Sequence, residues 1–316
     1  MSVRKVCVLG GTGFVGSHIV HRLSAAGHAV KVLTRRREDN RHLILLPNVQ
    51  VVECNVRDTV ALKEAITGAD AVINLVGILH QGHGASFSAV HAELPQRLVK
   101  VCQLLSVPRL LHMSALQAAA DAPSAYLRSK AAGERVVLDA HSESLKVTVF
   151  RPSVIFGRGD SFLNLFAGLL KWLPVVALAC PRARFQPVWV EDVAHAFVAA
   201  LDNPATFGQH YDLCGPKTYT LRELVQFVAV TIGARRCIVG LNDRFSYWQA
   251  AVMELLPAKL LTRDNYLSMQ VDSVCDCDFP ALFGIQPKPL EAVAPEYLAG
   301  DTPRAAYLRF RYKAGR

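Results

Sequence analysis

The segment Val6-Cys7-Val8-Leu9-Gly10-Gly11-Thr12-Gly13-Phe14-Val15-Gly16, close to the start of the chain, decides the fold. Its apolar run predicts a buried strand, and the helical pattern that follows the spaced glycines continues to Leu23. Gly10 permits a tight turn, Gly13 lets a pyrophosphate approach the backbone, and Gly16 lets the helix pack close to the strand. The free N–H groups at the start of the helix would hold the phosphates of a dinucleotide. The alternative interpretation is a glycine-rich turn without a ligand.

The composition predicts a globular protein with a large core. The chain has 316 residues, of which 51% are apolar and 19% charged, which is enough for one large α/β domain with a smaller lobe. The first strand starts so early that we expect no signal or transit peptide. The most apolar long stretch, 162–180, is interrupted by Lys171 and Pro174 and is a poor membrane span. We therefore expect a cytoplasmic protein.

The eight cysteines have no regular framework, and we expect reduced thiols. Cys275-Asp276-Cys277 resembles half of a metal site, but no second pair with ligand spacing follows. The sequence therefore predicts no metal.

Apolar strands alternate with helical patterns through the first half of the chain. The expected strands cover residues 28–34, 49–53, 71–77 and 109–113. This alternation predicts an α/β fold with a Rossmann-type, doubly wound parallel sheet. Ligands of such sheets bind at the carboxyl ends of the strands. The residues that fall at these ends are Gly10–Gly16, Arg35, Asn55, Leu75, Val76, Gly77 and Ser114.

The end of the second strand predicts the cofactor. Arg35 and Arg36 stand there, and the first acidic residue is Glu38. An acid at this position would bind the ribose 2′-hydroxyl of NAD, whereas arginines accommodate a 2′-phosphate. We therefore expect NADP(H), with NAD(H) as the alternative; the other interpretation is a solvated basic turn.

Three residues form a candidate catalytic group. Tyr126 and Lys130 are four residues apart in an expected helix and share a face. A nearby ammonium lowers the pKa of a phenol, which would make Tyr126 an acid/base group near neutral pH, and Lys130 would also bind the nicotinamide ribose. Ser114, at the end of the fifth strand, would orient a substrate oxygen. The alternative is an ordinary amphipathic helix face.

These motifs resemble the short-chain dehydrogenase/reductase superfamily in its extended or atypical branch, which is similar in fold to sugar-nucleotide epimerases. Further segments resemble the nucleotide-binding accessory subunit of respiratory complex I and its bacterial relatives. They are Asn74-Leu75-Val76-Gly77, Leu111-His112-Met113-Ser114-Ala115-Leu116, Tyr126-Leu127-Arg128-Ser129-Lys130, residues 151–164, residues 186–193, Thr262-Arg263-Asp264-Asn265 and Phe283-Gly284-Ile285-Gln286. The resemblance extends to about Leu298.

The resemblance implies a set of nucleotide contacts. The matching positions are Gly10, Thr12, Gly13, Phe14, Val15, Gly16, Arg35, Asn55, Val56, Pro152 and Ser153. Asn55 replaces an Asp that contacts adenine in many members, and its amide can still pair with the adenine edge. The complex I member holds NADPH and is regarded as structural rather than catalytic. That member has a transit peptide, whereas none is expected in this chain, so we expect a bacterial protein.

The expected domains follow the same pattern. Residues 1–155, with about 187–214, would form the dinucleotide-binding domain, and about 156–186 with 215–300 the smaller substrate or partner lobe. Residues 301–316 would be a basic tail, since residues 302–316 hold five basic residues and no acid, part of a net charge of +9. The tail is either loosely docked or bound at an anionic membrane surface, on the inner face of the cytoplasmic membrane. No recognition fold for nucleic acid accompanies it.

Three functions are compatible with the sequence. The main one is an oxidoreductase that transfers hydride between nicotinamide and a carbonyl or alcohol of an unknown small molecule, with Tyr126 as acid/base. The alternative is a non-catalytic accessory or scaffold protein of a complex I-like membrane respiratory complex with structural NADPH. The third is a sugar-nucleotide epimerase or dehydratase.

Overall fold

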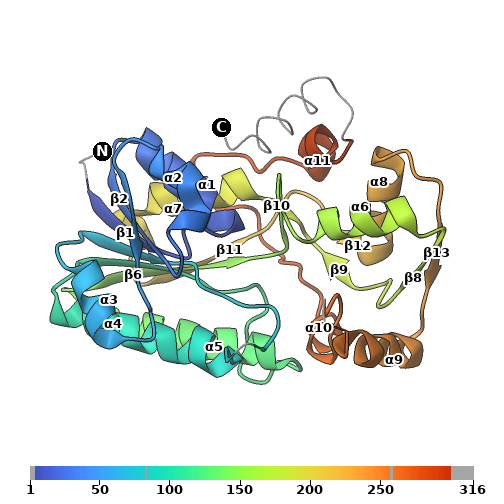
Figure 1. The fold of residues 1–316 in the computed structure, drawn as a ribbon, viewed down its shortest axis with the longest axis horizontal. Coiled ribbons are helices and arrows are strands. Elements are labelled where there is room, and N and C mark those ends of the chain that lie inside the picture. The colour runs from blue at the N-terminus through green and yellow to red at the C-terminus, as the bar shows by residue number, and fades with distance from the viewer. Residues whose placement is uncertain (1–3, 83, 257–258, 300–316) are drawn as a thin grey trace.

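A seven-stranded, wholly parallel sheet forms the centre of the molecule (Figure 1). The computed structural model describes residues 4–82, 84–256 and 259–299. The strand order is β3-β2-β1-β4-β5-β6-β11. The strands are β1 (Lys5–Leu9), β2 (Ala29–Thr34), β3 (Val49–Glu53), β4 (Ala71–Asn74), β5 (Arg109–Met113), β6 (Lys146–Pro152) and β11 (Gln209–Leu213). The predicted Rossmann-type fold is confirmed.

Helices cover both faces of this sheet, because every connection is a crossover between parallel strands (Figure 1). One face carries α1 (Phe14–Ala25), α2 (Arg41–Ile44) and α7 (Val190–Ala200). The other carries α3 (Thr59–Ile66), α4 (Leu94–Leu104) and α5 (Ala125–Asp139), and a π-helical turn, Ala89–Glu93, leads into α4. Two separate apolar cores fill the two sides. The inner strands β1, β4 and β5 are thus buried on both faces, as their mostly apolar sequences require.

A smaller group of elements lies beyond the carboxyl end of the sheet (Figure 1). Its own apolar core includes Leu170, Leu224 and Leu290. Its helices are α6 (Leu163–Trp172), α8 (Leu221–Thr231), α9 (Asp243–Glu254), α10 (Arg263–Ser268) and α11 (Leu290–Leu298). Its short strands are β7 (Ile155–Phe156), β8 (Val175–Leu178), β9 (Arg184–Phe185), β10 (Val188–Trp189), β12 (Tyr219–Thr220) and β13 (Cys237–Gly240).

One segment crosses the expected domain boundary. Phe279 and Phe283 are buried in the core beneath α1 and α7, together with Phe150 and Phe197. They therefore pack with the sheet, although the sequence boundaries assign residues 215–300 to the smaller lobe.

The cysteines differ from expectation in one place. Cys275 and Cys277 form a disulfide, so the expectation of reduced thiols does not hold for this pair. A Cys-x-Cys pair gives no framework signal, so the sequence alone predicts two free thiols there. Among the other cysteines of the described chain, Cys237 is exposed and the rest are buried and free.

Within residues 4–82, 84–256 and 259–299, we find no helix that is both long and apolar enough to cross a membrane. The basic tail, residues 301–316, lies outside the described residues.

Candidate functional site

The glycine-rich turn between β1 and α1 has the geometry that a phosphate site needs. Gly10 has a φ of +77°, and the Gly13 N–H donates to the Gly10 carbonyl at 3.0 Å. A Cβ on Gly16 would lie 2.1 Å from that same carbonyl oxygen, so only glycine fits there. Gly13 is the N-cap of α1, and no side chain caps the helix. The first N–H groups of α1 thus remain available to an anion.

This turn lies at the point where the strand order reverses. β1 stands between β2, which follows it in the chain, and β4. The turn after β4 runs against the glycine turn, since a Cβ on Gly10 would lie 3.0 Å from the carbonyl carbon of Leu75. Gly77, at the end of that turn, is exposed. The glycine turn and the turn after β4 thus meet at a topological switch point, where Rossmann-type sheets bind their ligands.

The expected 2′-phosphate residues lie exposed immediately after β2. Arg36 approaches Asp39 at 3.9 Å, and the backbone N–H of Arg37 donates to the Glu53 carboxylate at 2.8 Å. Arg35 makes no ion pair with any described residue. Its cation is therefore available at the edge of the site.

The expected adenine contacts follow β3. Asn55 is exposed, and its Oδ1 accepts from the Arg57 N–H at 3.1 Å. The carbonyl of Val56 accepts from the Arg97 guanidinium at 3.2 Å.

Tyr126 and Lys130 both lie in α5, but the Tyr126 phenol does not have the lowered pKa that the sequence suggested. Lys130 is buried, and its Nζ donates to the Met113 carbonyl at 2.9 Å. Burial lowers the pKa of Lys130 to about 8 and raises the pKa of Tyr126 to about 12. The expectation that Lys130 lowers the pKa of the Tyr126 phenol is therefore wrong in this structure, because desolvation dominates. Ser114 is buried, and its hydroxyl has no partner among the described residues.

His91 belongs to the site, although the sequence did not single it out. It lies in the π-helical turn before α4, with its Nδ1 2.8 Å from the Ser129 hydroxyl and its Nε2 accepting the Ile78 N–H at 3.0 Å. The ring stacks on Phe87 and meets Tyr126 edge-on. Burial, and then the charge of Lys130, lower the pKa of His91 to about 3. His91 thus joins the turn after β4 to α5, and no motif spacing marks it.

Asp264 is a second residue that motif spacing did not mark. Its carboxylate accepts the N–H of Ala125 at 2.7 Å and that of Tyr126 at 3.1 Å, at the start of α5. In the sequence, only the family resemblance of the segment 262–265 points to Asp264. In the structure this segment is the capped start of α10.

Pro152 and Ser153 are buried at the end of β6. The Ser153 hydroxyl donates to the Ser273 carbonyl at 2.7 Å. This turn therefore anchors the segment that carries Cys275.

Comparisons with known proteins agree with this geometry. The model of the NAD-dependent epimerase/dehydratase family matches residues 6–214. The mouse mitochondrial protein "NADH dehydrogenase [ubiquinone] 1 alpha subcomplex subunit 9" is 32% identical over 302 residues, or 92% of this chain and 78% of that protein. "Ceramide reductase" of Caulobacter vibrioides is 29% identical over 75% of this chain and 74% of its own length.

A solved structure shares the fold over nearly the whole length. WbmH of Bordetella bronchiseptica, in complex with NAD⁺, has a TM-score of 0.66 and 19% identity, and the match covers 98% of this chain and 99% of that one. The predicted resemblance to the complex I accessory subunit is confirmed by the mitochondrial relative. On its sequence and its fold, the chain belongs to the NAD-dependent epimerase/dehydratase family.

Proposed function

We propose that the protein binds NADP(H) at the glycine turn. The turn carries no side chain where the pyrophosphate would lie, and α1 offers uncapped N–H groups. Arg35 would bind the 2′-phosphate, and Lys130 and the turn at Ser153 would lie at the nicotinamide end. When bound, the nicotinamide supplies a hydride donor or acceptor.

We further propose that the nucleotide acts as a structural cofactor in an accessory protein of a membrane-associated respiratory complex. The observation that supports this structural role most directly is the surroundings of Tyr126 and Lys130, the candidate acid/base pair. The Lys130 ammonium is bound by the Met113 carbonyl, and burial raises the pKa of Tyr126 to about 12 instead of lowering it. The bound nucleotide would stabilise the folded protein by mass action. The likeness to the mitochondrial complex I subunit supports this role.

An apolar face on α9 supplies a surface for such a partner. Phe245, Trp248, Val252 and Leu255 are three or four residues apart and between 57% and 86% exposed. Side chains at this spacing form one helix face. Exposed apolar patches of this kind mark interaction sites.

The test compares partner association with nucleotide binding. Trp248→Ser should release the protein from its membrane-associated partner while NADPH affinity stays unchanged. Val230→Ser, which alters an exposed apolar residue on α8, is the matched control and should have no effect. If the wild-type protein sediments with neither membranes nor a respiratory complex in its own cells, the accessory role is rejected.

A second function is supported by Ser114. Its buried, unpartnered hydroxyl is suited to bind a substrate carbonyl or alkoxide oxygen, in a fold shared with the relative named ceramide reductase. In this alternative the protein is an oxidoreductase, and Tyr126 transfers the proton once substrate and nucleotide change its surroundings. Consumption of NADPH on addition of a cell extract, lost in Tyr126→Phe and Ser114→Ala, would identify the enzyme. A stable NADPH signal in every extract fraction would favour the structural cofactor.

A further inference from the structure

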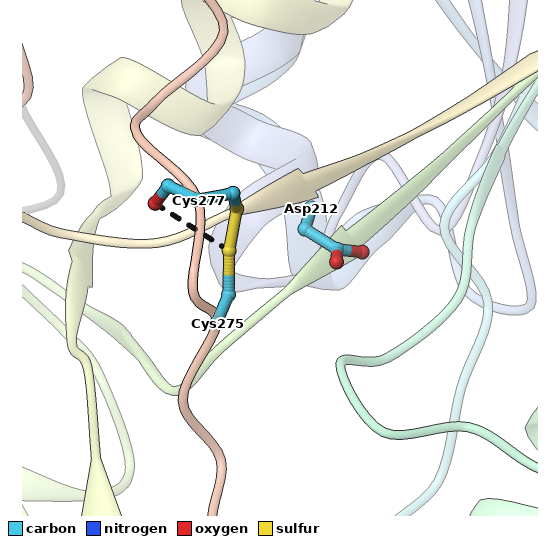
Figure 2. Close-up of side chains that lie close together, drawn as sticks. All are labelled: Asp212, Cys275 and Cys277. Carbon is cyan, nitrogen blue, oxygen red and sulfur yellow. Dashed lines mark hydrogen bonds between the residues drawn. A yellow bond between two sulfur atoms is a disulfide. The ribbon is translucent and has the colours of Figure 1, made fainter.

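The disulfide between Cys275 and Cys277 lies outside the nucleotide site, on the segment that leads from α10 to the sheet (Figure 2). We propose that this pair is a redox-active site that exchanges its disulfide with small thiols of the glutathione type. The proposal concerns the two sulfur atoms and does not depend on the nucleotide.

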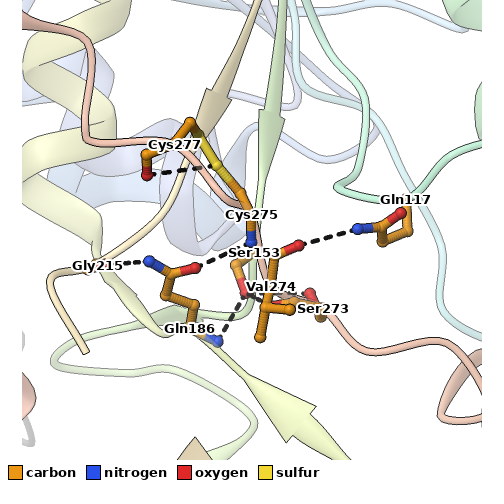
Figure 3. Close-up of a disulfide and its surroundings, with 8 residues drawn as sticks. All are labelled: Gln117, Ser153, Gln186, Gly215, Ser273, Val274, Cys275 and Cys277. Atoms are coloured by element: carbon orange, nitrogen blue, oxygen red, sulfur yellow. Dashed lines mark hydrogen bonds between the residues drawn. A yellow bond between two sulfur atoms is a disulfide. The ribbon is translucent and has the colours of Figure 1, made fainter. Parts of the chain in front are cut away.

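Three side chains from other parts of the fold bind the backbone of this segment (Figure 3). The Cys275 N–H donates to the Gln186 side chain at 3.0 Å. The Gln117 side-chain N–H₂ donates to the Val274 carbonyl at 2.9 Å, and Ser153 binds the Ser273 carbonyl. These hydrogen bonds place the disulfide while it is closed, and the two sulfurs stay close when the bond opens because only one residue separates the cysteines.

Accessibility distinguishes this pair from most other cysteines of the chain. Cys277 is exposed and Cys275 is half-buried, so a small thiol can reach the sulfur of Cys277. Cys7, Cys54, Cys102, Cys180 and Cys214 are buried. Burial raises the pKa of four of them, Cys7, Cys102, Cys180 and Cys214, to between about 11 and about 12, and it also raises the pKa of Cys54, so they do not react at neutral pH. Cys237 is exposed but has no disulfide partner, which makes it a matched control.

Asp212, on β11, sets the charge next to the sulfurs (Figure 2). Its carboxylate lies within 4.8 Å of both, and its buried Oδ1 has no hydrogen-bond partner among the described residues. A carboxylate repels both an approaching thiolate and the thiolate that leaves. Asp212 thus slows the opening of the disulfide.

Opening the disulfide completely consumes two small thiols, which react one after the other. A thiolate of the first attacks the Cys277 sulfur, the bond to Cys275 breaks, and Cys275 leaves as a thiolate that takes a proton from water. A second thiolate then attacks the small-molecule sulfur of the mixed disulfide, which releases the oxidised small disulfide and the Cys277 thiolate. Two electrons pass from two thiols to the protein, and the reverse sequence closes the bond.

The test is a count of reactive thiols in the native full-length protein. The protein is equilibrated in glutathione buffers of increasing reduced fraction, alkylated without denaturant and weighed by intact mass spectrometry. The thiols of Cys275 and Cys277 should become reactive together, both in the wild type, where the exposed Cys237 reacts in every buffer, and in Cys237→Ser. Cys275→Ser and Cys277→Ser should each leave one thiol that no longer forms an internal disulfide. When alkylation is instead timed after reduced glutathione is added, the disulfide of Asp212→Asn should open about threefold faster than that of the wild type, or more.

Three results would overturn the proposal. The pair could stay closed in fully reduced glutathione, or both thiols could be alkylated in every buffer. In the third, the reduced protein binds one Zn²⁺ that blocks alkylation and requires Asp212, which would make the cluster a metal site instead.

Discussion

Asp264 accepts a hydrogen bond from the backbone N–H of Tyr126 at 3.1 Å, and so joins the start of α10 to the helix that carries the candidate acid/base residue. The same carboxylate accepts the N–H of Ala125 at 2.7 Å. A carboxylate at the N-terminus of a helix also interacts favourably with the helix dipole. The smaller lobe thereby fixes the beginning of α5.

Asp264→Ala should lower the free energy of unfolding by about 1 kcal/mol, because two N–H groups of α5 lose their acceptor. Thermal unfolding measures the loss. Asp121→Ala, an exposed acid in the loop before α5, is the control and should unfold like the wild type. Equal stability of the two variants would mean that water replaces Asp264 without cost.

The sequence predicted the central sheet because its signals are local. The strand–turn–helix at residues 6–23 and the alternation of apolar strands with helices determine the order of the elements. Local sequence also starts α8, where Thr220 and Glu223 form a capping box.

The chemistry of the site was harder to predict, because it depends on burial and on contacts distant in sequence. Four-residue spacing places Tyr126 and Lys130 on one face but does not reveal that Met113 binds the ammonium. The contact between His91 and Ser129 joins residues 38 positions apart, and that of Asp264 with Tyr126 spans 138. A pKa follows such surroundings rather than the motif.

Two glycines of the turn should respond differently to alanine. Gly16→Ala places a Cβ 2.1 Å from a carbonyl oxygen and should destabilise the fold as well as remove nucleotide binding. Gly13→Ala has its nearest contact at 3.3 Å and a φ of −76°, so the fold should persist while the phosphate site is obstructed. Circular dichroism and NADPH titration separate the two effects. If Gly13→Ala binds NADPH as the wild type does, the pyrophosphate does not lie at this turn.

Arg35 should determine the preference between the two nicotinamide dinucleotides. Arg35→Ala removes a charge-assisted contact to the 2′-phosphate and should weaken NADPH binding about tenfold or more. NADH binding should stay unchanged, since NADH has no 2′-phosphate. Arg37→Ala, the matched control two residues later, should leave both affinities unchanged. Equal losses for NADPH and NADH, measured by fluorescence titration, would argue against the assignment.

Two buried histidines should make the protein less stable in acid. Burial lowers the pKa of His91 and that of His112 to about 3. Above about pH 6.5 both are neutral in the folded and the unfolded chain. As the pH falls from about 6.5 towards 3, only the unfolded chain takes up protons, so the free energy of unfolding falls, by up to about 1.4 kcal/mol per pH unit for each histidine.

Thermal unfolding between pH 7 and 4 tests this titration. His91→Gln should have a shallower pH dependence than the wild type, whatever its stability at pH 7. The exposed His42→Gln is the control and should keep the wild-type slope. An unchanged slope in His91→Gln would assign the acid sensitivity to other groups.

The redox state of Cys275 and Cys277 should influence nucleotide binding through Ser153. The disulfide fixes the segment whose Ser273 carbonyl binds the Ser153 hydroxyl, and Ser153 lies in the turn expected at the nicotinamide. Opening the disulfide frees this segment, so the nucleotide must order it again on binding. The reduced protein should therefore bind NADPH several-fold more weakly than the oxidised protein, in a titration that monitors both the thiol count and the NADPH fluorescence.

Cys275→Ser should bind NADPH weakly in both oxidising and reducing buffers, while Cys237→Ser should follow the wild type. Identical affinities before and after reduction of the pair would show that the segment keeps its place without the disulfide.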